Sequence, residues 1–379
     1  MSSETDNFFE GKRPWSKIKD RIFSSYMHVY LAKINHRGDP IILIDAFAGP
    51  GVFDDGSPGS PFIMCSAAEK YVKGKYQAFF VNEKAKYHQK LESVLQKGGW
   101  FPQATSVLGD SQDFLKRITP LLRDPKDHAV FLYLDPFGLK DCMFSTVEPF
   151  LNRNRRTSTE IVINLSMPII HRLAGREKTK EGTIDPEIRD KRSDLLTRVL
   201  GGDYWKEPML SEGLETKERE RLVIEGYQKQ LSKNGYLRFT GACPISPTRD
   251  GATKYYMVFA SAHRDTKKIF NDEMIKAFNE YMNQQEMADT LFADLSWKDW
   301  RDLEELKRIV CDYILNNPGV KRLDLWHLIL GDHFLRFTET EYRQSVKALF
   351  EQGIINSPTP RPRPKQLNDD CLLYITQNQ

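Results

Sequence analysis

The sequence Ile41-Ile-Leu-Ile-Asp-Ala-Phe-Ala-Gly-Pro-Gly51 is an apolar run that ends in an aspartate and breaks at once into glycines. The length of the run and its isoleucine and leucine content favour a buried parallel strand over a helix. The glycines let the backbone turn tightly and approach a ligand closely. This stretch predicts a doubly wound α/β fold with a nucleoside-bearing cofactor at the end of its first strand, although a plain turn has the same glycines.

The composition is that of a globular protein with little net charge. The 379 residues allow two or three domains, and 55 basic residues stand against 52 acidic ones, so the whole-chain charge favours no class of partner. Five scattered cysteines have neither zinc nor redox spacing. We expect no secretory leader, and no run approaches the ~18 apolar residues of a membrane span. We expect a cytoplasmic protein that binds neither a membrane nor a metal.

Strands alternate with helices after a polar tail, predicted to be disordered, at 1–14. This alternation implies parallel β-α-β units, so we expect a Rossmann-like α/β domain at 15–290 with a helical insertion at 172–235. An amphipathic helix at 15–34 precedes the first strand. The predicted strands span 41–45, 77–82, 105–108, 130–134, 160–165, 237–240 and 254–260.

Four features then follow in the order expected of class I S-adenosylmethionine-dependent methyltransferases, and the first two lie at the first and second strands. Asp45, Gly49 and Gly51 would form the turn beneath the methionine part of the cofactor. Phe47 lies within the same turn. Glu83 ends the second strand, where an acid can accept hydrogen bonds from ribose hydroxyls. A strand-end acid can instead cap the next helix, and this alternative stays open for Glu83.

The other two features end the third and fourth strands. Asp110 and Ser111 follow the third strand, where Asp110 would contact the adenine amino group or cap the next helix. Asp135 ends the fourth strand. Acids at four successive strand ends favour S-adenosylmethionine as the cofactor more strongly than any one acid alone.

The loop after the first strand is longer than usual. Asp45 and Glu83 lie 38 residues apart, whereas the acid usually stands about 20 residues beyond the glycines. The excess lies at 52–61, which is either a lid over the cofactor or a longer turn. Ser60 is predicted to cap a helix whose first residue is Pro61.

The most specific motif is Asp135-Pro-Phe-Gly138. Enzymes that methylate an exocyclic amine place a carboxylate or amide oxygen and a proline carbonyl where both accept hydrogen bonds from the NH2 group, while an aromatic ring stacks on the base. Asp135, Pro136 and Phe137 are therefore the predicted catalytic residues, and the effect is mostly positioning. The motif departs from D/N-P-P-aromatic and resembles that of tRNA guanosine-N2 dimethyltransferases; a plain strand-end turn is the alternative.

Further substrate contacts are expected at the same end of the sheet. Gly138 and Asn164 belong to loops there, and Arg172 would hold a phosphate or lie on a solvated helix face. The basic run Arg153-Asn-Arg-Arg156 would guide a polyanion toward the site or form a solvated turn.

The C-terminal region 296–379 shows three helical segments, at 297–316, 322–330 and 339–352, followed by two short strands. This is the order of a winged helix, whose third helix enters the major groove of DNA. Arg343 and Lys347 lie on that helix, and the proline-rich wing at 360–365 carries further basic residues. Nucleic acid is slightly favoured over a protein partner.

Taken together, the motifs resemble those of the three-Cys-motif partner proteins, a prokaryotic family of methyltransferase-like proteins. The resemblance implies association with a radical-type protein that bears three clustered cysteines, a cluster that this chain lacks. The matching residues are Trp15, Lys17 and Tyr26, the stretch Asp45–Gly51, Gly59-Ser-Pro61, Asn82-Glu83, Leu134–Gly138 and Tyr255–His263.

Three functions remain open from the sequence. The first is an S-adenosylmethionine-dependent N-methyltransferase that acts on a base in nucleic acid, which would be flipped out of a duplex. The second is a catalytically silent methyltransferase fold that binds nucleic acid or regulates the three-cysteine protein. The third is another enzyme in the same pocket, such as a nuclease, for which the sequence offers no cluster of metal ligands.

Overall fold

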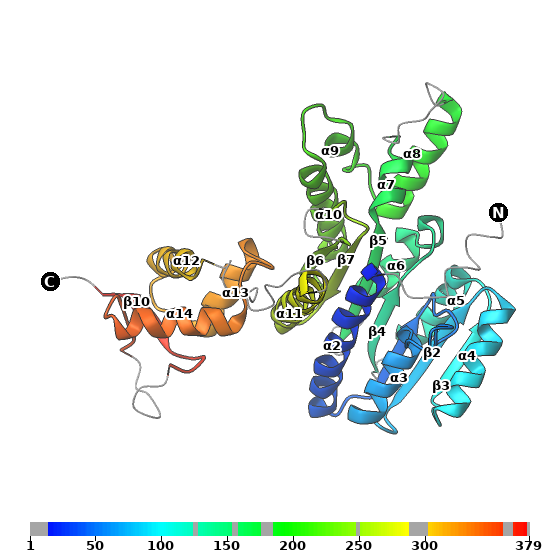
Figure 1. Cartoon of the computed structure of the whole chain (residues 1–379), viewed down its shortest axis with the longest axis horizontal. Coiled ribbons are helices and arrows are strands. Elements are labelled where there is room, and N and C mark those ends of the chain that lie inside the picture. Colours follow the sequence, from blue (N-terminus) through cyan, green and yellow to red (C-terminus); the bar gives the residue numbers. More distant parts are fainter. Residues whose placement is uncertain are drawn as a thin grey trace. The chain divides into compact units, whose positions relative to one another are not determined.

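The chain divides between Thr266 and Lys267 into two compact units, which are described separately (Figure 1). The computed structural model describes residues 14–123, 128–153, 158–175, 185–247, 251–287, 302–358 and 367–376. The predicted tail up to residue 13 and the predicted domain boundary at 290–296 lie outside these ranges.

Unit 1 is built on a sheet whose described strands run in the order β3-β2-β1-β4-β5-β7-β6. Strands β1 to β5 pair in parallel, and β7 is antiparallel to both β5 and β6. This is the order of the Rossmann-like class I methyltransferase fold, and the predicted doubly wound α/β sheet is confirmed. The strands are β1 (Ile41–Asp45), β2 (Tyr76–Asn82), β3 (Ala104–Leu108), β4 (Ala129–Leu134), β5 (Thr159–Ser166), β6 (Phe239–Ile245) and β7 (Tyr255–Ser261).

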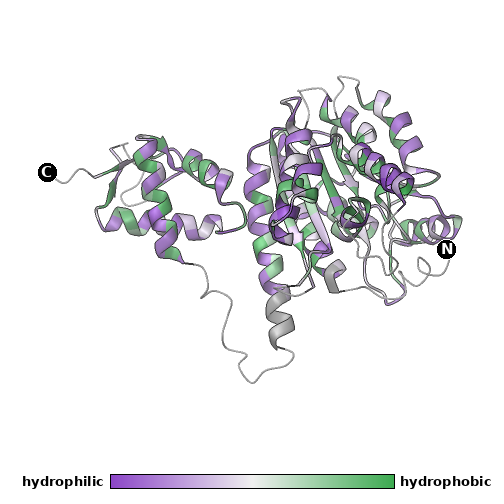
Figure 2. Ribbon diagram, turned by 90° about the horizontal axis from the view of Figure 1, so that it is seen from above, coloured by the Kyte–Doolittle hydropathy of each residue, from purple (hydrophilic) through white to green (hydrophobic). Residues whose placement is uncertain are grey.

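Helices cover both faces of the sheet (Figure 2). The central strands β1, β4 and β5 are buried throughout. Successive residues of a strand point to opposite faces, so a strand covered on both sides is apolar at nearly every position. The helices of unit 1 are α2 (Pro14–Arg37), α3 (Ser60–Tyr71), α4 (Ala85–Lys97), α5 (Ser111–Ile118), α6 (Phe144–Leu151), α7 (Met167–Leu173), α8 (Pro186–Leu200), α9 (Lys206–Leu210) and α10 (Thr216–Ser232). The insertion predicted at 172–235 is helical over much of its described part.

Aromatic side chains fix α2 against β4. The ring of Phe23 stacks on Tyr133 with centroids 4.3 Å apart, and Tyr30 meets Phe131 at 5.3 Å. On the opposite face of the sheet, apolar strand residues such as Val130 and Leu132 pack against α5, α6, α8 and α10 in one hydrophobic core. Large buried rings therefore hold much of α2 on β4.

Arg153 holds together the amino ends of β4 and β5. The arginine is 3% exposed, and its guanidinium donates to the carbonyl oxygens of Leu122 (2.9 Å) and His128 (2.6 Å) and to Thr159 Oγ1 (2.9 Å). These partners lie at the opposite end of the strands from Asp135. Both alternatives for this run, a guide for a polyanion and a solvated turn, are therefore wrong for Arg153, while 154–156 lie outside the described residues.

We expect Arg153→Met to lower the free energy of unfolding by about 2–4 kcal/mol, because it leaves buried acceptors without a donor. Urea titration measures the change. The matched control is Arg189→Met on the exposed surface of α8, which should shift stability by less than about 0.5 kcal/mol. Equal effects of the two substitutions would contradict a structural role for Arg153.

The described part of unit 2 has three helices and a small antiparallel sheet around its own core, in addition to most of α11 (Asp265–Met287). Trp326 stacks on Tyr342 in this core with ring centroids 4.8 Å apart. Thr338 and Glu341 form a capping box at the start of the third helix. The elements are α12 (Leu303–Asn316), β8 (Val320–Lys321), α13 (Arg322–Asp332), α14 (Glu339–Glu351), β9 (Ile355–Asn356) and β10 (Leu372–Ile375), with the strand order β8-β10-β9.

Among the described helices, none combines the length and the apolar character that a membrane span requires.

Candidate functional site

A buried carboxyl group organises the turn after β1. Asp45 is fully buried; its Oδ1 accepts the backbone N–H of Phe47 at 3.0 Å, and its Oδ2 accepts the hydroxyl of Ser60 at 2.6 Å. Burial raises the pKa of Asp45 to about 7, against the opposing effect of these two hydrogen bonds. Asp45 thus ties the end of β1 to the start of α3.

The hydroxyl of Ser60 does not cap α3, so the predicted N-cap is wrong. The helix begins at Ser60 itself, Gly59 holds the N-cap position, and no side chain caps this end. Because Asp45 lies next to it, Ser60 donates to that carboxyl group instead of accepting from the helix backbone. This contact lies between residues 15 positions apart and was not visible in the local sequence.

The excess loop after the glycines is a small closed hairpin. Val52 and Pro58 form an antiparallel bridge, and the N–H of Gly59 donates to the carbonyl oxygen of Gly51 at 2.8 Å. The Asp55 carboxylate accepts the N–H of Ser57 at 2.9 Å. The loop therefore has its own internal hydrogen bonds.

The glycines occupy backbone conformations that side chains disfavour. Gly49 and Gly51 have φ angles of 65° and 79°. A Cβ atom at Gly51 would also lie 2.7 Å from Leu91 Cδ1. The buried amide of Asn82, at the end of β2, donates to the Gly49 carbonyl oxygen at 2.9 Å. The turn is thus anchored to the neighbouring strand.

The first cavity lies at the carboxyl ends of β1, β2 and β3. It contains most of the predicted cofactor residues, whereas Asp45 is buried outside its lining and Gly51 faces another cavity. The lining residues are Ala46, Phe47, Gly49, Val81, Asn82, Glu83, Lys84, Tyr87, Asp110, Ser111, Phe137 and Asp141.

Three carboxyl groups give the first cavity an acidic wall. Burial raises the pKa of Asp141, and the charges of Glu83 and Asp110 act in the same direction, against Lys140. Asp110 also accepts the N–H of Asp113 at 2.9 Å as the N-cap of α5, which was the structural alternative for this residue. Such a wall suits a ligand that carries positive charge or hydrogen-bond donors.

Ser111 fixes the floor between β1 and α5. Its hydroxyl donates to the carbonyl oxygen of Ala46 at 2.6 Å, and the side chain is buried. Ser111 therefore helps to shape the first cavity.

The second cavity is built around Asp135. The carboxylate forms an ion pair with the ammonium of Lys19 from α2, and the ring centroid of Tyr255 lies 5.4 Å from that ammonium. The lining residues are Ser16, Lys19, Asp20, Phe47, Ala48, Pro50, Gly51, Phe53, Gly59, Ser60, Asp135, Pro136, Phe137 and Tyr255. The hairpin after the glycines thus lines this cavity.

Lys19 remains charged although it is buried. Burial lowers the pKa of a lysine, but the carboxylates of Asp135 and Asp20 outweigh this effect and raise the pKa of Lys19 above its ordinary value. The side chain of Lys19 is 8% exposed and that of Asp135 is 25% exposed. Asp135 is the more accessible member of the pair.

Phe47 and Phe137 line both cavities. The ring of Phe137 is 48% exposed, which is high for a phenylalanine. Because these rings are common to the two linings, they mark the place where the cavities adjoin. A ligand in the first cavity would meet a ligand in the second cavity at this boundary.

Several predicted substrate residues line neither of these two cavities. Asn164 is buried in the sheet and donates to the Tyr133 hydroxyl at 2.9 Å. Gly138 begins the short turn after the Asp135 motif, and Arg172 is exposed on α7.

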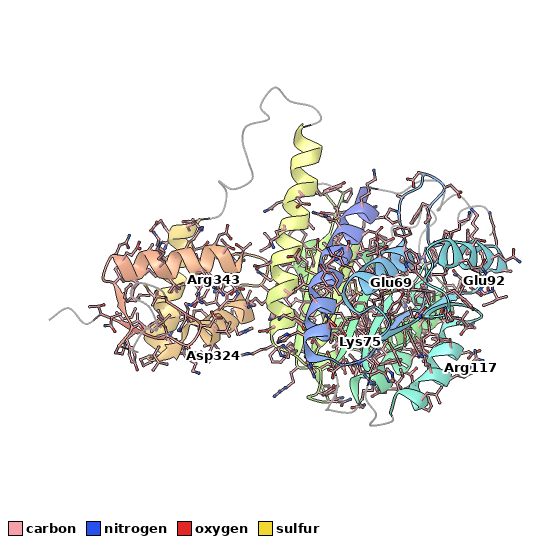
Figure 3. The ribbon with its side chains drawn as sticks, turned by 90° about the horizontal axis from the view of Figure 1, so that it is seen from below. Glu69, Lys75, Glu92, Arg117, Asp324 and Arg343 are labelled. Atoms are coloured by element: carbon pink, nitrogen blue, oxygen red, sulfur yellow. The ribbon has the colours of Figure 1, made fainter. Side chains whose placement is uncertain are left out.

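Arg343 and Lys347 lie in unit 2 on α14, where Figure 3 labels Arg343. Arg343 is bound to Glu339 at 2.6 Å and lies 3.4 Å from Asp369. Lys347 lies 3.7 Å from Glu351. Both basic groups therefore have acidic partners within their own unit.

The sequence reasoning did not single out Lys19, Tyr255 or Asp141 as site residues. Lys19 and Asp135 are 116 positions apart, so no local pattern joins them. Tyr255 belonged to a quoted family motif, which was its only signal. Within the described residues, no group of three or more histidine, cysteine or acidic side chains is arranged to hold a metal ion.

No family model and no curated protein matches this chain in sequence. Solved structures that it resembles include a protein from Legionella pneumophila (TM-score 0.40, 10% identity, 70% of this chain and 92% of that one). An O-methyltransferase from Bacillus cereus in complex with SAH matches with a TM-score of 0.34 and 10% identity over 68% and 94% of the two chains. An rRNA methylase from Streptococcus thermophilus matches with a TM-score of 0.29 and 14% identity, over 62% of this chain and 92% of that one. Because these TM-scores are below 0.5, the matches carry no argument about substrate or reaction.

The raised pKa of Asp45 makes stability depend on pH. Between about pH 4 and about pH 7 the unfolded chain loses the Asp45 proton while the folded chain keeps it, so this residue's contribution to stability falls as pH rises. Asp45→Asn should remove that component, and its stability relative to wild type should rise by up to ~1.4 kcal/mol per pH unit in this window. Urea titrations across the window measure it, with Asp190→Asn on the surface as control. Parallel profiles for wild type and Asp45→Asn would contradict the buried proton.

Proposed function

We propose that this protein is an S-adenosylmethionine-dependent N-methyltransferase that acts on an exocyclic amine of a base in nucleic acid. The observation that carries the proposal is the adjacency of the two cavities at Phe47 and Phe137, with Asp135-Pro136 on the substrate side. Two ligands that react with each other need such a shared boundary.

The first cavity fits the proposed cofactor. Glu83 would accept hydrogen bonds from the ribose hydroxyls, and Asp110 would accept one from the adenine amino group. The positive-φ glycines allow the backbone to approach the methionine part. The acidic wall of Glu83, Asp110 and Asp141 suits a cofactor with a positively charged sulfonium. The cofactor would supply an electrophilic methyl group.

The chain's own contribution to the reaction would be orientation. The Asp135 carboxylate would accept a hydrogen bond from the substrate amine, and the carbonyl oxygen of Pro136 would accept a second one. These contacts would turn the nitrogen lone pair toward the cavity boundary. Positioning of reactants can lower an activation barrier by ~7–11 kcal/mol, and this orientation would supply several kcal/mol of that amount. The exposed ring of Phe137 would stack on the base.

For unit 2 we propose a winged helix that binds nucleic acid. Its support is the element order helix, strand, two helices and two strands, with α14 as the third helix. Arg343 and Lys347 would exchange their acidic partners for phosphates, whereas the wing residues at 360–365 lie outside the described residues.

The salt dependence of binding tests this role. Arg343→Ala with Lys347→Ala in the full chain should weaken binding to a labelled oligonucleotide and make the slope of log affinity against log salt shallower by about 2. Fluorescence anisotropy across a salt series measures both quantities. The control is Lys307→Ala on α12, a partly buried lysine paired with Glu304. An unchanged slope would favour a protein partner for this unit.

We also propose that the protein works with a three-Cys-motif partner, and the support for this is the resemblance of the sequence motifs alone. Analytical ultracentrifugation of the two purified proteins tests it. A complex is the expected result, and separate sedimentation at micromolar concentrations would contradict it.

One observation favours a second function, a catalytically silent methyltransferase fold. The ion pair with Lys19 already occupies an oxygen of Asp135, the group that would orient an amine. Binding of S-adenosylmethionine without transfer to RNA or DNA would support the silent fold.

Two substitutions separate cofactor binding from transfer. Glu83→Ala should weaken S-adenosylmethionine binding by about tenfold or more, because a charged hydrogen-bond acceptor contributes ~1.5–3 kcal/mol. Asp135→Ala should abolish transfer and leave cofactor affinity within about twofold of wild type. Isothermal titration and transfer of a labelled methyl group measure the two effects. Intact transfer by Asp135→Ala would overturn the proposed amine-orienting site.

A further inference from the structure

The ion pair of Lys19 and Asp135 lies in the lining of the second cavity. Lys19 comes from α2 and Asp135 from the end of β4, and the Tyr255 ring lies 5.4 Å from the ammonium. An ammonium has three N–H donors, so that its bond to Asp135 leaves donor capacity for another acceptor in the cavity. The pair thus places a hydrogen-bond donor directly beside a hydrogen-bond acceptor.

Attachment of α2 to the sheet does not require this pair. Phe23 stacks on Tyr133 at 4.3 Å, and Tyr26 and Tyr30 meet Phe131 at 6.1 and 5.3 Å. Apolar packing is already extensive there, and replacing a buried ion pair with apolar residues is often neutral or stabilising. The pair is therefore poorly explained by stability, and its position in the cavity directs attention to the substrate.

The bases differ in what adjoins their exocyclic amine. In adenine and in cytosine, the amine that donates stands next to a ring nitrogen that accepts, at N1 and N3 respectively. On the Watson–Crick edge of guanine the amine stands next to N1–H, which donates; the acceptor N3 lies on the other side of the amine, on the sugar edge. A site that offers an acceptor beside a donor to the Watson–Crick edge matches adenine and cytosine and places two donors together against guanine.

We propose that Lys19 determines the base specificity of the site: Asp135 accepts a hydrogen bond from the exocyclic amine while Lys19 donates to the adjoining ring nitrogen, which selects adenine or cytosine over guanine. This inference rests on the proposed methyltransferase function and narrows its substrate class. It departs from the guanine preference that the Asp135-Pro-Phe-Gly138 resemblance would imply. Lys19 acts here by binding the base, so its effect is on which base reacts.

The test removes single atoms from the substrate. Oligonucleotides carry adenine, 1-deazaadenine or, as the matched control, 7-deazaadenine, and a parallel set carries cytosine and 3-deazacytosine. Methyl transfer is followed with labelled S-adenosylmethionine, and the products are identified as nucleosides by mass spectrometry. For the base that wild type methylates, we expect loss of the ring nitrogen to lower kcat/KM about tenfold or more, and 7-deazaadenine to react like adenine.

Variants at position 19 assign this effect to Lys19. Lys19→Met should lower kcat/KM for the natural base about tenfold. This variant should methylate the natural base and its deaza analogue with equal kcat/KM, because the donor to the ring nitrogen is already absent. Lys19→Arg keeps the charge and the donors and should retain discrimination. Thermal unfolding and S-adenosylmethionine affinity report whether each variant is folded, and the wild-type comparison of analogues stands even where Lys19→Met fails to fold.

The outcomes separate the inference from the function on which it rests. Methylation of the guanine amine, or equal rates on natural and deaza bases, would overturn the role of Lys19 while keeping the methyltransferase. Retained discrimination in a folded Lys19→Met would also overturn it. Cofactor binding with no transfer to any base would overturn the proposed function and the inference together.

Discussion

The buried carboxyl group of Asp45 is the constraint on which the rest of the site depends. It accepts hydrogen bonds from Phe47 and Ser60, and so it fixes both the turn after β1 and the start of α3. Loss of either bond would leave a buried polar oxygen unsatisfied, which is costly. Because Asn82 holds the same turn from β2, the floor shared by the two cavities is set before any ligand enters.

The sequence was sufficient to predict the central strands and the cavity around Glu83 and Asp110, for a physical reason. Strands covered by helices on both faces are apolar at nearly every position, and the residues that follow parallel strands meet at one edge of the sheet. Contacts between distant segments had no such signal. Lys19 reaches Asp135 across 116 positions, and Asn164 lies buried against Tyr133 and lines neither of the two cavities. The sequence placed Arg153 in a basic run at the surface, whereas its guanidinium donates hydrogen bonds to the carbonyl oxygens of Leu122 and His128.

The distribution of charge bears on how a nucleic acid would approach. The first cavity keeps the acidic wall of Glu83, Asp110 and Asp141, which suits a cationic cofactor. If the second cavity receives a nucleic acid, as we propose, an uncompensated carboxylate at Asp135 would repel its phosphate groups. The ammonium of Lys19 cancels that charge locally while leaving the carboxylate able to accept hydrogen bonds.

The same pair acts on the turn below it. Asp135 raises the pKa of Asp45 and Lys19 lowers it, so the two effects on the buried carboxyl group oppose each other. If a base drew the ammonium away from Asp135, the balance at Asp45 would also change, because all three groups lie in one weakly screened region. The ammonium of Lys19, to which we assign recognition of the base, and the Asp45 carboxyl group that shapes the turn are therefore electrostatically coupled. A substitution at Lys19 has to be interpreted through both specificity and the protonation of Asp45, and the deaza substrates separate these effects because they leave every protein charge in place.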